Sequence, residues 1–262
     1  MASNLSTDEL FHFTSFENLK GIIEFGFYPK YNLEHTLLSN AFDRPAAVEL
    51  IPMVCFCDIP LALVHEHSGK YGKCAIGLDK DWGEEFGLNP VIYVAPNSIL
   101  GDAISALGNS FVGYKSSMIS DESDFSICNM ISQNAIGVRQ LSYFVKQYEQ
   151  VKEEYICFNN EHYHKLKPGR FYDEREWRYV PPNSREDMWL LDHADFFDKE
   201  KMTAANELVK RNYLTFQLHH IRYIVCETSE QKEELINLIA TKFEEQKSGV
   251  EKQIIFKLHN EL

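Results

Sequence analysis

The sequence predicts one domain of the α+β class. Strand-like segments do not alternate regularly with helices, as they would in a doubly wound parallel sheet. The chain instead opens with a strand and a helix, continues through several strands, and closes with a strand, a helix and a strand. Its 262 residues, 44% of them hydrophobic, are enough to bury one full core. We therefore expect a single domain over residues 1–262, with a helical insertion at about 97–150.

The first two elements are a short strand at residues 10–14 and the helix that follows it. Thr14 or Ser15 can cap the N-terminus of this helix, and Gly26 can end it. Leu19 lies in its apolar stripe. The chain is therefore expected to turn sharply just after its opening strand.

Strands dominate the next part of the chain. Residues 27–50 contain two prolines and show no sustained period, so we expect a long surface loop there, of the kind that forms lids. The run PMVCFCDIP at 52–60 is continuously apolar, which predicts a strand buried on both faces. Further strands are expected at 74–78 and 89–94.

Helical spacing returns after residue 97 and extends to about 152. The later elements are expected in this order: a hydrophilic segment at 153–170, a glutamate-rich strand at 171–182, an irregular then helical segment at 189–211, a strand at 221–226, a helix capped by Thr228 or Ser229, and a last strand at 253–258.

Composition limits the classes of function. The formal net charge of −13 disfavours broad binding of phosphate backbones unless a local basic patch overrides it. The sequence has no apolar run of about 18 residues, and its polar, acidic N-terminus lacks the pattern of a signal peptide, so we expect a cytoplasmic protein without a membrane segment. The cysteines lie mostly in apolar contexts that favour reduced, buried thiols: Cys55, Cys57, Cys74, Cys128, Cys157 and Cys226.

The stretch FYDEREWRYVPP at 171–182 carries the main candidate residues. Side chains at positions i and i+2 of a strand point to the same face, so Glu174, Glu176 and Arg178 should share one wall. Two neighbouring carboxylates raise each other's pKa and are costly unless they are paired or used. The alternative is a solvated edge strand in which Glu and Arg form cross-strand ion pairs.

Other motifs give weaker signals. Cys55-x-Cys57 lacks the two-residue gap of redox and zinc motifs, so packing is favoured over ligation. GKYGK does not have the spacing of a phosphate-binding P-loop. Two histidine pairs could each offer two imidazoles to a metal ion, but no carboxylate or thiolate partner stands at a recognisable spacing, and we expect no metal. These pairs are His65-x-His67 and His162-x-His164.

His12 and Thr14 lie on one face of the opening strand, at its C-terminal end. Two interpretations remain open for His12. It is either a histidine at the edge of the core, hydrogen-bonded to backbone, or part of a site that also includes the glutamates.

The N-terminal FHFTSFENLKGIIEFGF resembles the opening of DarT-like ADP-ribosyltransferases, in which a His-x-Thr strand begins the NAD site. A wider pattern resembles the AbiGi family of bacterial abortive phage-resistance proteins: this opening, then VCFCDIPL, HEHSGKYGKCAIGLDKDWG and YDEREWRY. The resemblance spans residues 10–180 in order.

The ADP-ribosyltransferase resemblance implies a split β-sheet core that holds NAD as a substrate. It implies that His12 binds the ribose next to nicotinamide. It also implies that Glu176 bonds that ribose and stabilises the oxocarbenium-like charge as nicotinamide leaves, while Glu174 orients the acceptor. The reaction would then be transfer of ADP-ribose to protein, DNA or RNA, or NAD cleavage by water.

The same resemblance suggests the remaining cofactor-binding residues. Phe13 and Thr14 would lie beside His12 in the NAD site. Arg44 is a candidate for the arginine that DarT-like enzymes use. The aromatic shelf for nicotinamide has three candidates: Phe56, Tyr71 and Tyr93.

The AbiGi resemblance implies phage defence and an antitoxin role. It therefore leaves a second interpretation, a non-catalytic antitoxin or sensor that binds a toxin or another partner protein. A third, a metal-dependent hydrolase built on the histidine pairs, requires bound metal.

Overall fold

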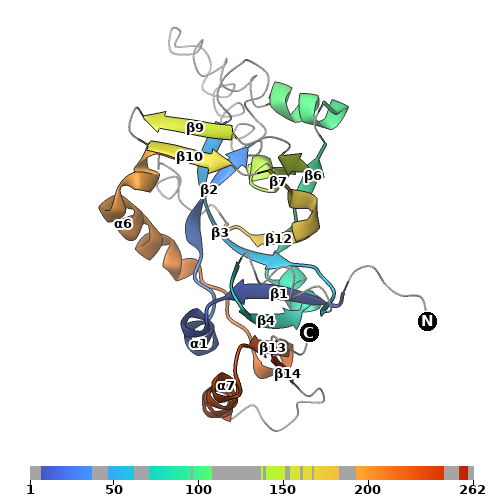
Figure 1. Cartoon of the computed structure of the whole chain (residues 1–262), viewed down its shortest axis with the longest axis vertical. Coiled ribbons are helices and arrows are strands. Elements are labelled where there is room, and N and C mark those ends of the chain that lie inside the picture. Colours follow the sequence, from blue (N-terminus) through green and yellow to red (C-terminus); the bar gives the residue numbers. More distant parts are fainter. Residues whose placement is uncertain are drawn as a thin grey trace, which may run out of the picture.

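The computed structural model describes residues 7–36, 47–61, 71–95, 97–107, 137, 140–150, 154–159, 162–166, 168–182, 193–244 and 254–258. Strands and helices are mixed along the chain, which confirms the α+β class (Figure 1). No helix in these ranges has the length and apolar character needed to cross a membrane.

The main sheet has eight strands in the order β14-β13-β4-β1-β3-β12-β5, with β2 paired to β3 outside this path. All its pairs are antiparallel except β13 with β14. The bounds are β1 Glu9–Thr14, β2 Lys30–Thr36, β3 Ala47–Cys57, β4 Cys74–Asp79, β5 Asn89–Pro90, β12 Glu176–Tyr179, β13 Ile221–Cys226 and β14 Ile255–Leu258.

Three two-stranded sheets accompany the main one. They pair β6 Ile92–Val94 with β7 Val145–Gln147, β8 Glu149–Gln150 with β11 Gly169–Arg170, and β9 Glu154–Asn159 with β10 His162–Leu166. The helices are α1 Phe16–Phe25, α3 Lys80–Glu85, α6 Lys199–Val209 and α7 Ser229–Lys242, together with a helical segment at residues 99–107. Short 3-10 turns are η4 Phe171–Glu174, η6 His193–Phe197, η7 Lys210–Asn212 and η8 Leu218–His220.

Helix α1 begins and ends where the sequence predicts. The Ser15 hydroxyl accepts a hydrogen bond from the Asn18 backbone N–H, and the Gly26 N–H donates to the Ile22 carbonyl. Gly26 has φ +87°, and a Cβ there would lie 2.3 Å from the Leu214 carbonyl oxygen. Only glycine satisfies both conditions without strain. This turn ends α1 and allows Phe27 to pair with Leu214.

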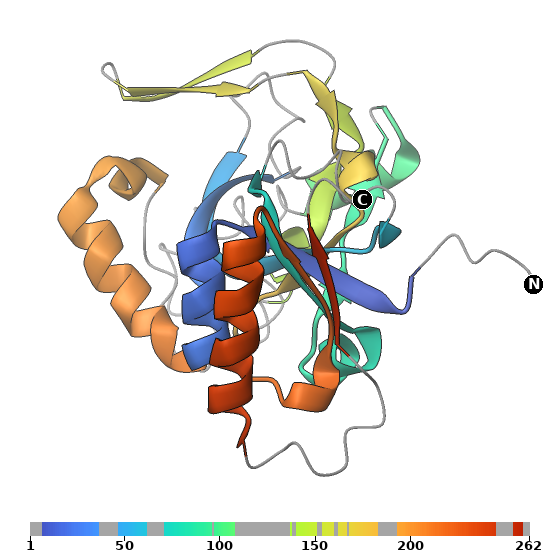
Figure 2. The ribbon, with the colours of Figure 1, turned by 60° about the horizontal axis from the view of Figure 1, so that its bottom comes forward.

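Helices α1 and α7 lie side by side against the sheet (Figure 2). Their buried stripes join the largest core cluster, to which α1 contributes Leu19 and Ile23 and α7 contributes Leu235 and Ile239. The Thr228 hydroxyl caps α7, as expected, by accepting from a backbone N–H in its first turn. The core therefore fixes the helix that follows β1.

Two sequence predictions were wrong in the connecting regions. Residues 27–50 are not one long loop, since they contain β2 and the start of β3. The predicted helical insertion at 97–150 contains helix at 99–107 but ends in strands β7 and β8. Apolar residues near Val145 recur at helical spacing, but hydrogen bonding to β6 decides their conformation.

The main sheet is almost divided between β1 and β3. Strand β1 pairs with β4 through six consecutive residues, but with β3 only at Phe11 opposite Cys57. Beyond that pair the two strands separate, so the residues of β1 after Phe11 border an opening on the side of β3, while on their other side they stay paired with β4. This opening is where the candidate site lies.

Candidate functional site

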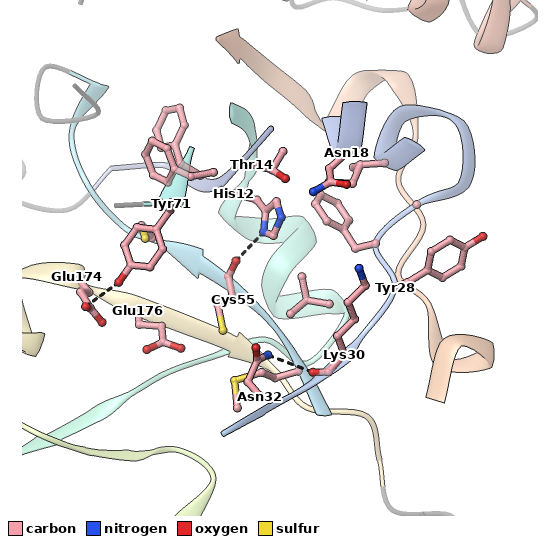
Figure 3. A pocket seen from close by; sticks show the side chains of 18 of the residues that line it. His12, Thr14, Asn18, Tyr28, Lys30, Asn32, Cys55, Tyr71, Glu174 and Glu176 are labelled. Atoms are coloured by element: carbon pink, nitrogen blue, oxygen red, sulfur yellow. Dashed lines mark hydrogen bonds between the residues drawn. The ribbon is translucent and has the colours of Figure 1, made fainter. Parts of the chain in front are cut away.

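A cavity of about 690 Å³ occupies the opening between β1 and β3. Its volume is in the range typical of small-molecule and cofactor sites. Helix α1 and strand β2 form one side, and the segment before β12 forms the other (Figure 3). Six residues singled out from the sequence line it: His12, Phe13, Thr14, Tyr71, Glu174 and Glu176. The structure thus brings residues of the opening strand and of the glutamate-rich stretch to the same cavity.

His12 spans the gap between the separated strands. Its Nδ1 lies 2.8 Å from the Cys55 carbonyl oxygen, an acceptor that the divergence of β1 and β3 leaves available. Because a carbonyl can only accept, Nδ1 carries the proton. Burial lowers the pKa of His12, so its ring is neutral and Nε2 remains an acceptor. His12 is therefore bonded to backbone and also lines the cavity, which combines the two sequence interpretations.

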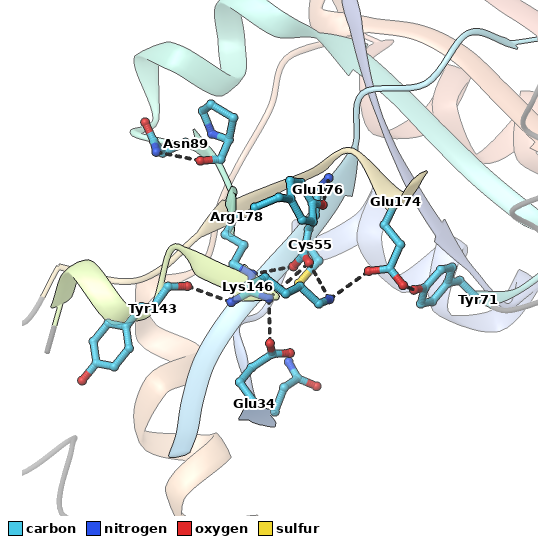
Figure 4. A network of polar contacts seen from close by, with 12 residues as sticks. Glu34, Cys55, Tyr71, Asn89, Tyr143, Lys146, Glu174, Glu176 and Arg178 are labelled. Carbon is cyan, nitrogen blue, oxygen red and sulfur yellow. Dashed lines mark hydrogen bonds and ion pairs between the residues drawn. The ribbon is translucent and has the colours of Figure 1, made fainter. Parts of the chain in front are cut away.

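Glu176 lies within a buried ion-pair network (Figure 4). Arg178 Nε donates to Glu176 Oε1 at 2.6 Å, and Lys146 Nζ lies 3.0 Å from Oε2. Arg178, with no exposed surface, also donates to Glu34 at 2.7 Å and to the Tyr143 carbonyl at 2.7 Å. Strand β12 lies between β3 and β5, so the solvated edge-strand alternative is wrong. Two cations from separate strands thus hold the carboxylate in place.

Glu174 contacts the same lysine, but from a turn and not from a strand. It ends turn η4 rather than lying in a strand, and Arg175 follows in the left-handed conformation with φ 46°. The predicted i, i+2 strand geometry was therefore wrong for this pair. Lys146 Nζ nonetheless lies 2.8 Å from Glu174 Oε2, and Tyr71 donates to Oε1 at 2.7 Å. The turn places the two carboxylates on either side of one ammonium group.

The charges of this network keep Glu176 ionised. Burial alone would raise the pKa of its carboxyl group, but Arg178 and Lys146 outweigh burial and lower the pKa to about 2. The pKa of Lys146 is raised in turn, because the surrounding carboxylates outweigh its own desolvation. At neutral pH the cavity is therefore lined by a fixed carboxylate and a neutral imidazole.

Acid is expected to remove the stabilisation that Glu176 provides. Its pKa is lower in the folded protein than the value of about 4.3 in an unfolded chain, so its contribution is present above that value and is lost as pH falls toward 2. In urea unfolding, the stability difference between the native chain and Glu176→Gln should be constant from pH 6 to 8 and shrink between about pH 5 and 2. A difference that does not change with pH would contradict this assignment.

The other predicted site residues have different positions. Phe56 does not line the cavity, which corrects that prediction: its side chain has no exposed surface and packs in the core against Phe27, whereas Cys55 and Cys57 on either side of it line the cavity. Tyr93 accepts the Glu176 backbone N–H at 2.8 Å. Arg44 lies outside the described residues.

The described part of the chain contains no cluster of metal ligands, and its Cys57 is not an activated nucleophile. Burial raises the pKa of the Cys57 thiol to about 12, so it is protonated and a poor nucleophile. Within the described ranges no three His, Cys, Asp or Glu side chains are grouped to hold a metal ion. The side chains of both His-x-His pairs, of Cys128 and of Cys157 lie outside the described part. Four cysteines in the described ranges are reduced thiols: Cys55, Cys57, Cys74 and Cys226.

Sequence reasoning missed two members of the network. Lys146 lies in β7, inside the predicted helical insertion, and Glu34 lies in β2, inside the predicted loop. Neither residue stands in a local motif. The residues around Lys146, YFVKQY, do not alternate between apolar and polar side chains, so the sequence offered no strand signal there.

Comparison with known proteins places the chain in a family. The model of the family described as "Putative abortive phage resistance protein AbiGi, antitoxin" matches residues 26–227. A protein from Lactococcus lactis subsp. cremoris named "Abortive phage resistance protein AbiGi" is 30% identical over 229 residues, covering 82% of this chain and 88% of the relative. No solved structure matches. The family model and the relative both cover most of the chain, which therefore belongs to the AbiGi family of abortive phage resistance proteins.

Proposed function

We propose that this protein acts in abortive phage resistance by binding NAD in the cavity and breaking its bond to nicotinamide. ADP-ribose would pass to a macromolecule or to water. The observation that carries the proposal is that neutral His12 on β1 and ionised Glu176 on β12 line one cavity on the two sides of β3. Paired strands are about 4.8 Å apart, and β1 separates from β3 beyond Phe11, so the two backbones are at least two strand spacings, roughly 10 Å, apart, which leaves room for a ribose between the side chains.

The groups in the cavity suit the chemistry of that reaction. When the bond between ribose C1 and the nicotinamide nitrogen breaks, nicotinamide takes the electron pair and C1 becomes oxocarbenium-like. A carboxylate that is already ionised and held by Arg178 stabilises this positive charge without reorganising. The acceptor then bonds to C1 and releases a proton. In this proposal Glu174, whose carboxylate is held by Tyr71 and Lys146, orients that acceptor.

The form of the sheet also supports the proposal. An ADP-ribosyltransferase-like core requires a sheet that opens to admit NAD, and β1 and β3 meet at one residue pair before they separate. His12 stands where they separate, and its Nε2 can accept a hydrogen bond from a ribose hydroxyl. Tyr71, 45% exposed, is the predicted aromatic shelf residue that lines the cavity.

The test is to incubate the purified chain with NAD labelled in its ADP-ribose part, alone and with lysate of phage-infected cells. Nicotinamide release without labelled macromolecules indicates hydrolysis, and label on protein, DNA or RNA identifies the class of acceptor. If the chain neither binds NAD nor releases nicotinamide in either mixture, the proposal fails.

His12→Asn is expected to weaken NAD binding about fivefold. The Asn amide can still donate to the Cys55 carbonyl, but the acceptor at Nε2 is lost, and one hydrogen bond is worth on the order of 1 kcal/mol. Isothermal titration calorimetry measures the Kd directly. His219→Asn, an exposed histidine outside the cavity, is the matched control and should bind NAD as the native chain does. Equal affinities for the two variants would remove His12 from the site.

A second function is favoured by the description of the family as an antitoxin. In this case the chain binds a toxin protein, and the cavity is not used for turnover. Co-purification from the native host distinguishes the two functions. An antitoxin retains its partner when Glu176 is replaced by Gln and loses it through substitutions on the surface, whereas an enzyme loses nicotinamide release.

A further inference from the structure

The two ends of the cavity differ in charge. Glu174 and Glu176 lie at one end with Lys146 between them. Lys30, from the start of β2, lines the other end, near α1. In Figure 3 its side chain extends toward Tyr28 and Asn18 and away from the glutamates.

Lys30 differs from Lys146 in its partners. Lys146 and Lys30 are the lysines among the described lining residues, and no described arginine lines the cavity. Lys146 is neutralised by two carboxylates at 2.8 and 3.0 Å. Lys30 forms no ion pair with any described residue, although its backbone carbonyl accepts from the Asn32 amide. Lys30 is therefore the cation that can take an anion without breaking an existing ion pair.

The surroundings of Lys30 also suit an anionic oxygen ligand. Asn18 and Tyr28 line the same end of the cavity and carry an amide and a hydroxyl that can donate. The Lys210 ammonium lies 4.9 Å from the centre of the Tyr28 ring, but it is paired with Glu207 at 3.5 Å, so the positive charge of this end comes from Lys30. Glu17 of α1 also lines the cavity, but it is paired with Lys20 at 3.1 Å, so Lys30 and the two donors remain a local site for an anion in a chain with a net charge of −13.

We propose that Lys30, with Asn18 and Tyr28, binds the diphosphate of a dinucleotide whose ribose lies at Glu176. This inference rests on the proposed function for the identity of the ligand, but the charge of the subsite does not depend on catalysis. The orientation follows from electrostatics. Phosphates are repelled by the glutamates and attracted by Lys30, whereas the positively charged nicotinamide ring is attracted by the glutamates and repelled by Lys30. Lys30 is then a positioning residue that sets which end of the ligand meets Glu176.

The test is titration of the native chain, Lys30→Gln and a matched control, Lys199→Gln, with four probes. Lys199 is exposed on α6 and outside the cavity, so its loss changes net charge equally. The probes are NAD, ADP-ribose, inorganic pyrophosphate and nicotinamide riboside. Lys30→Gln should lower the affinity for the three phosphate-bearing probes about tenfold, as expected for loss of a charge-assisted hydrogen bond. Its affinity for nicotinamide riboside should be unchanged. Added salt should weaken NAD binding by the native chain more than by Lys30→Gln.

The outcomes separate this inference from the proposed function. If Lys30→Gln binds NAD and ADP-ribose as tightly as Lys199→Gln does, the subsite is overturned while NAD binding stands. If ADP-ribose and pyrophosphate bind in a Lys30-dependent way but NAD is not cleaved, the subsite is supported and the proposed function fails. If Lys30→Gln lowers the affinity for nicotinamide riboside as much as it lowers the affinity for the other probes, the subsite is overturned, because nicotinamide riboside has no phosphate.

Discussion

Replacing Glu176 with glutamine is expected to lower nicotinamide release from NAD by at least about 10²-fold. Glutamine keeps the shape of the side chain but removes the negative charge that faces the developing oxocarbenium ion. Loss of one preorganised electrostatic group of this kind typically costs 10²–10³ in rate. The measurement is the initial rate of nicotinamide release with labelled NAD, with circular dichroism to show that the variant is folded.

Variants of two other carboxylates, Glu17 and Glu174, are the controls for this result. Glu17 lies at the rim of the cavity with a side chain that is 77% exposed, so Glu17→Gln should leave the rate within about twofold of native. Glu174→Gln should retain nicotinamide release but reduce transfer of label to the acceptor, since Glu174 is assigned to orientation. If Glu176→Gln and Glu17→Gln release nicotinamide equally, the carboxylate of Glu176 is not catalytic.

Replacing Arg178 with methionine is expected to cause the largest loss of stability, about 3–5 kcal/mol. Methionine fills much of the same volume, but it leaves Glu176, Glu34 and the Tyr143 carbonyl without their shared donor. Removing one partner of a fully buried ion pair leaves an uncompensated charge, which is far more costly than the net value of the pair. The free energy of unfolding in urea gives the size of the loss.

A surface arginine provides the control for this prediction. Arg170 is 57% exposed and lies 3.7 Å from Asp173, so Arg170→Met should change the free energy of unfolding by less than about 1 kcal/mol. The double variant Arg178→Met with Glu176→Gln should be less destabilised than the sum of the single variants, because it removes both charges together. Similar stabilities for Arg178→Met and Arg170→Met would show that the network does not support the fold.

The sequence by itself determined the elements in which local signals agree. The Ser15 cap and Gly26 stop of α1, the apolar run of β3 and the strand and capped helix near the C-terminus each depend on neighbouring residues, and the structure confirms them. The sequence also indicated His12, Tyr71, Glu174 and Glu176 as members of one site, and they line one cavity.

Only the tertiary structure decided how that site is charged and shaped. Lys146 and Glu34 reach it from strands that are held by pairing with β6 and β3, and neither pairing has a signature near those residues in the sequence. Arg175 turns the chain between the two glutamates, so their shared contact with Lys146 does not follow from strand alternation. The opening between β1 and β3 depends on where pairing stops, which is set by long-range packing of both strands. Local propensity therefore selected the elements, and contacts between residues distant in sequence made the cavity.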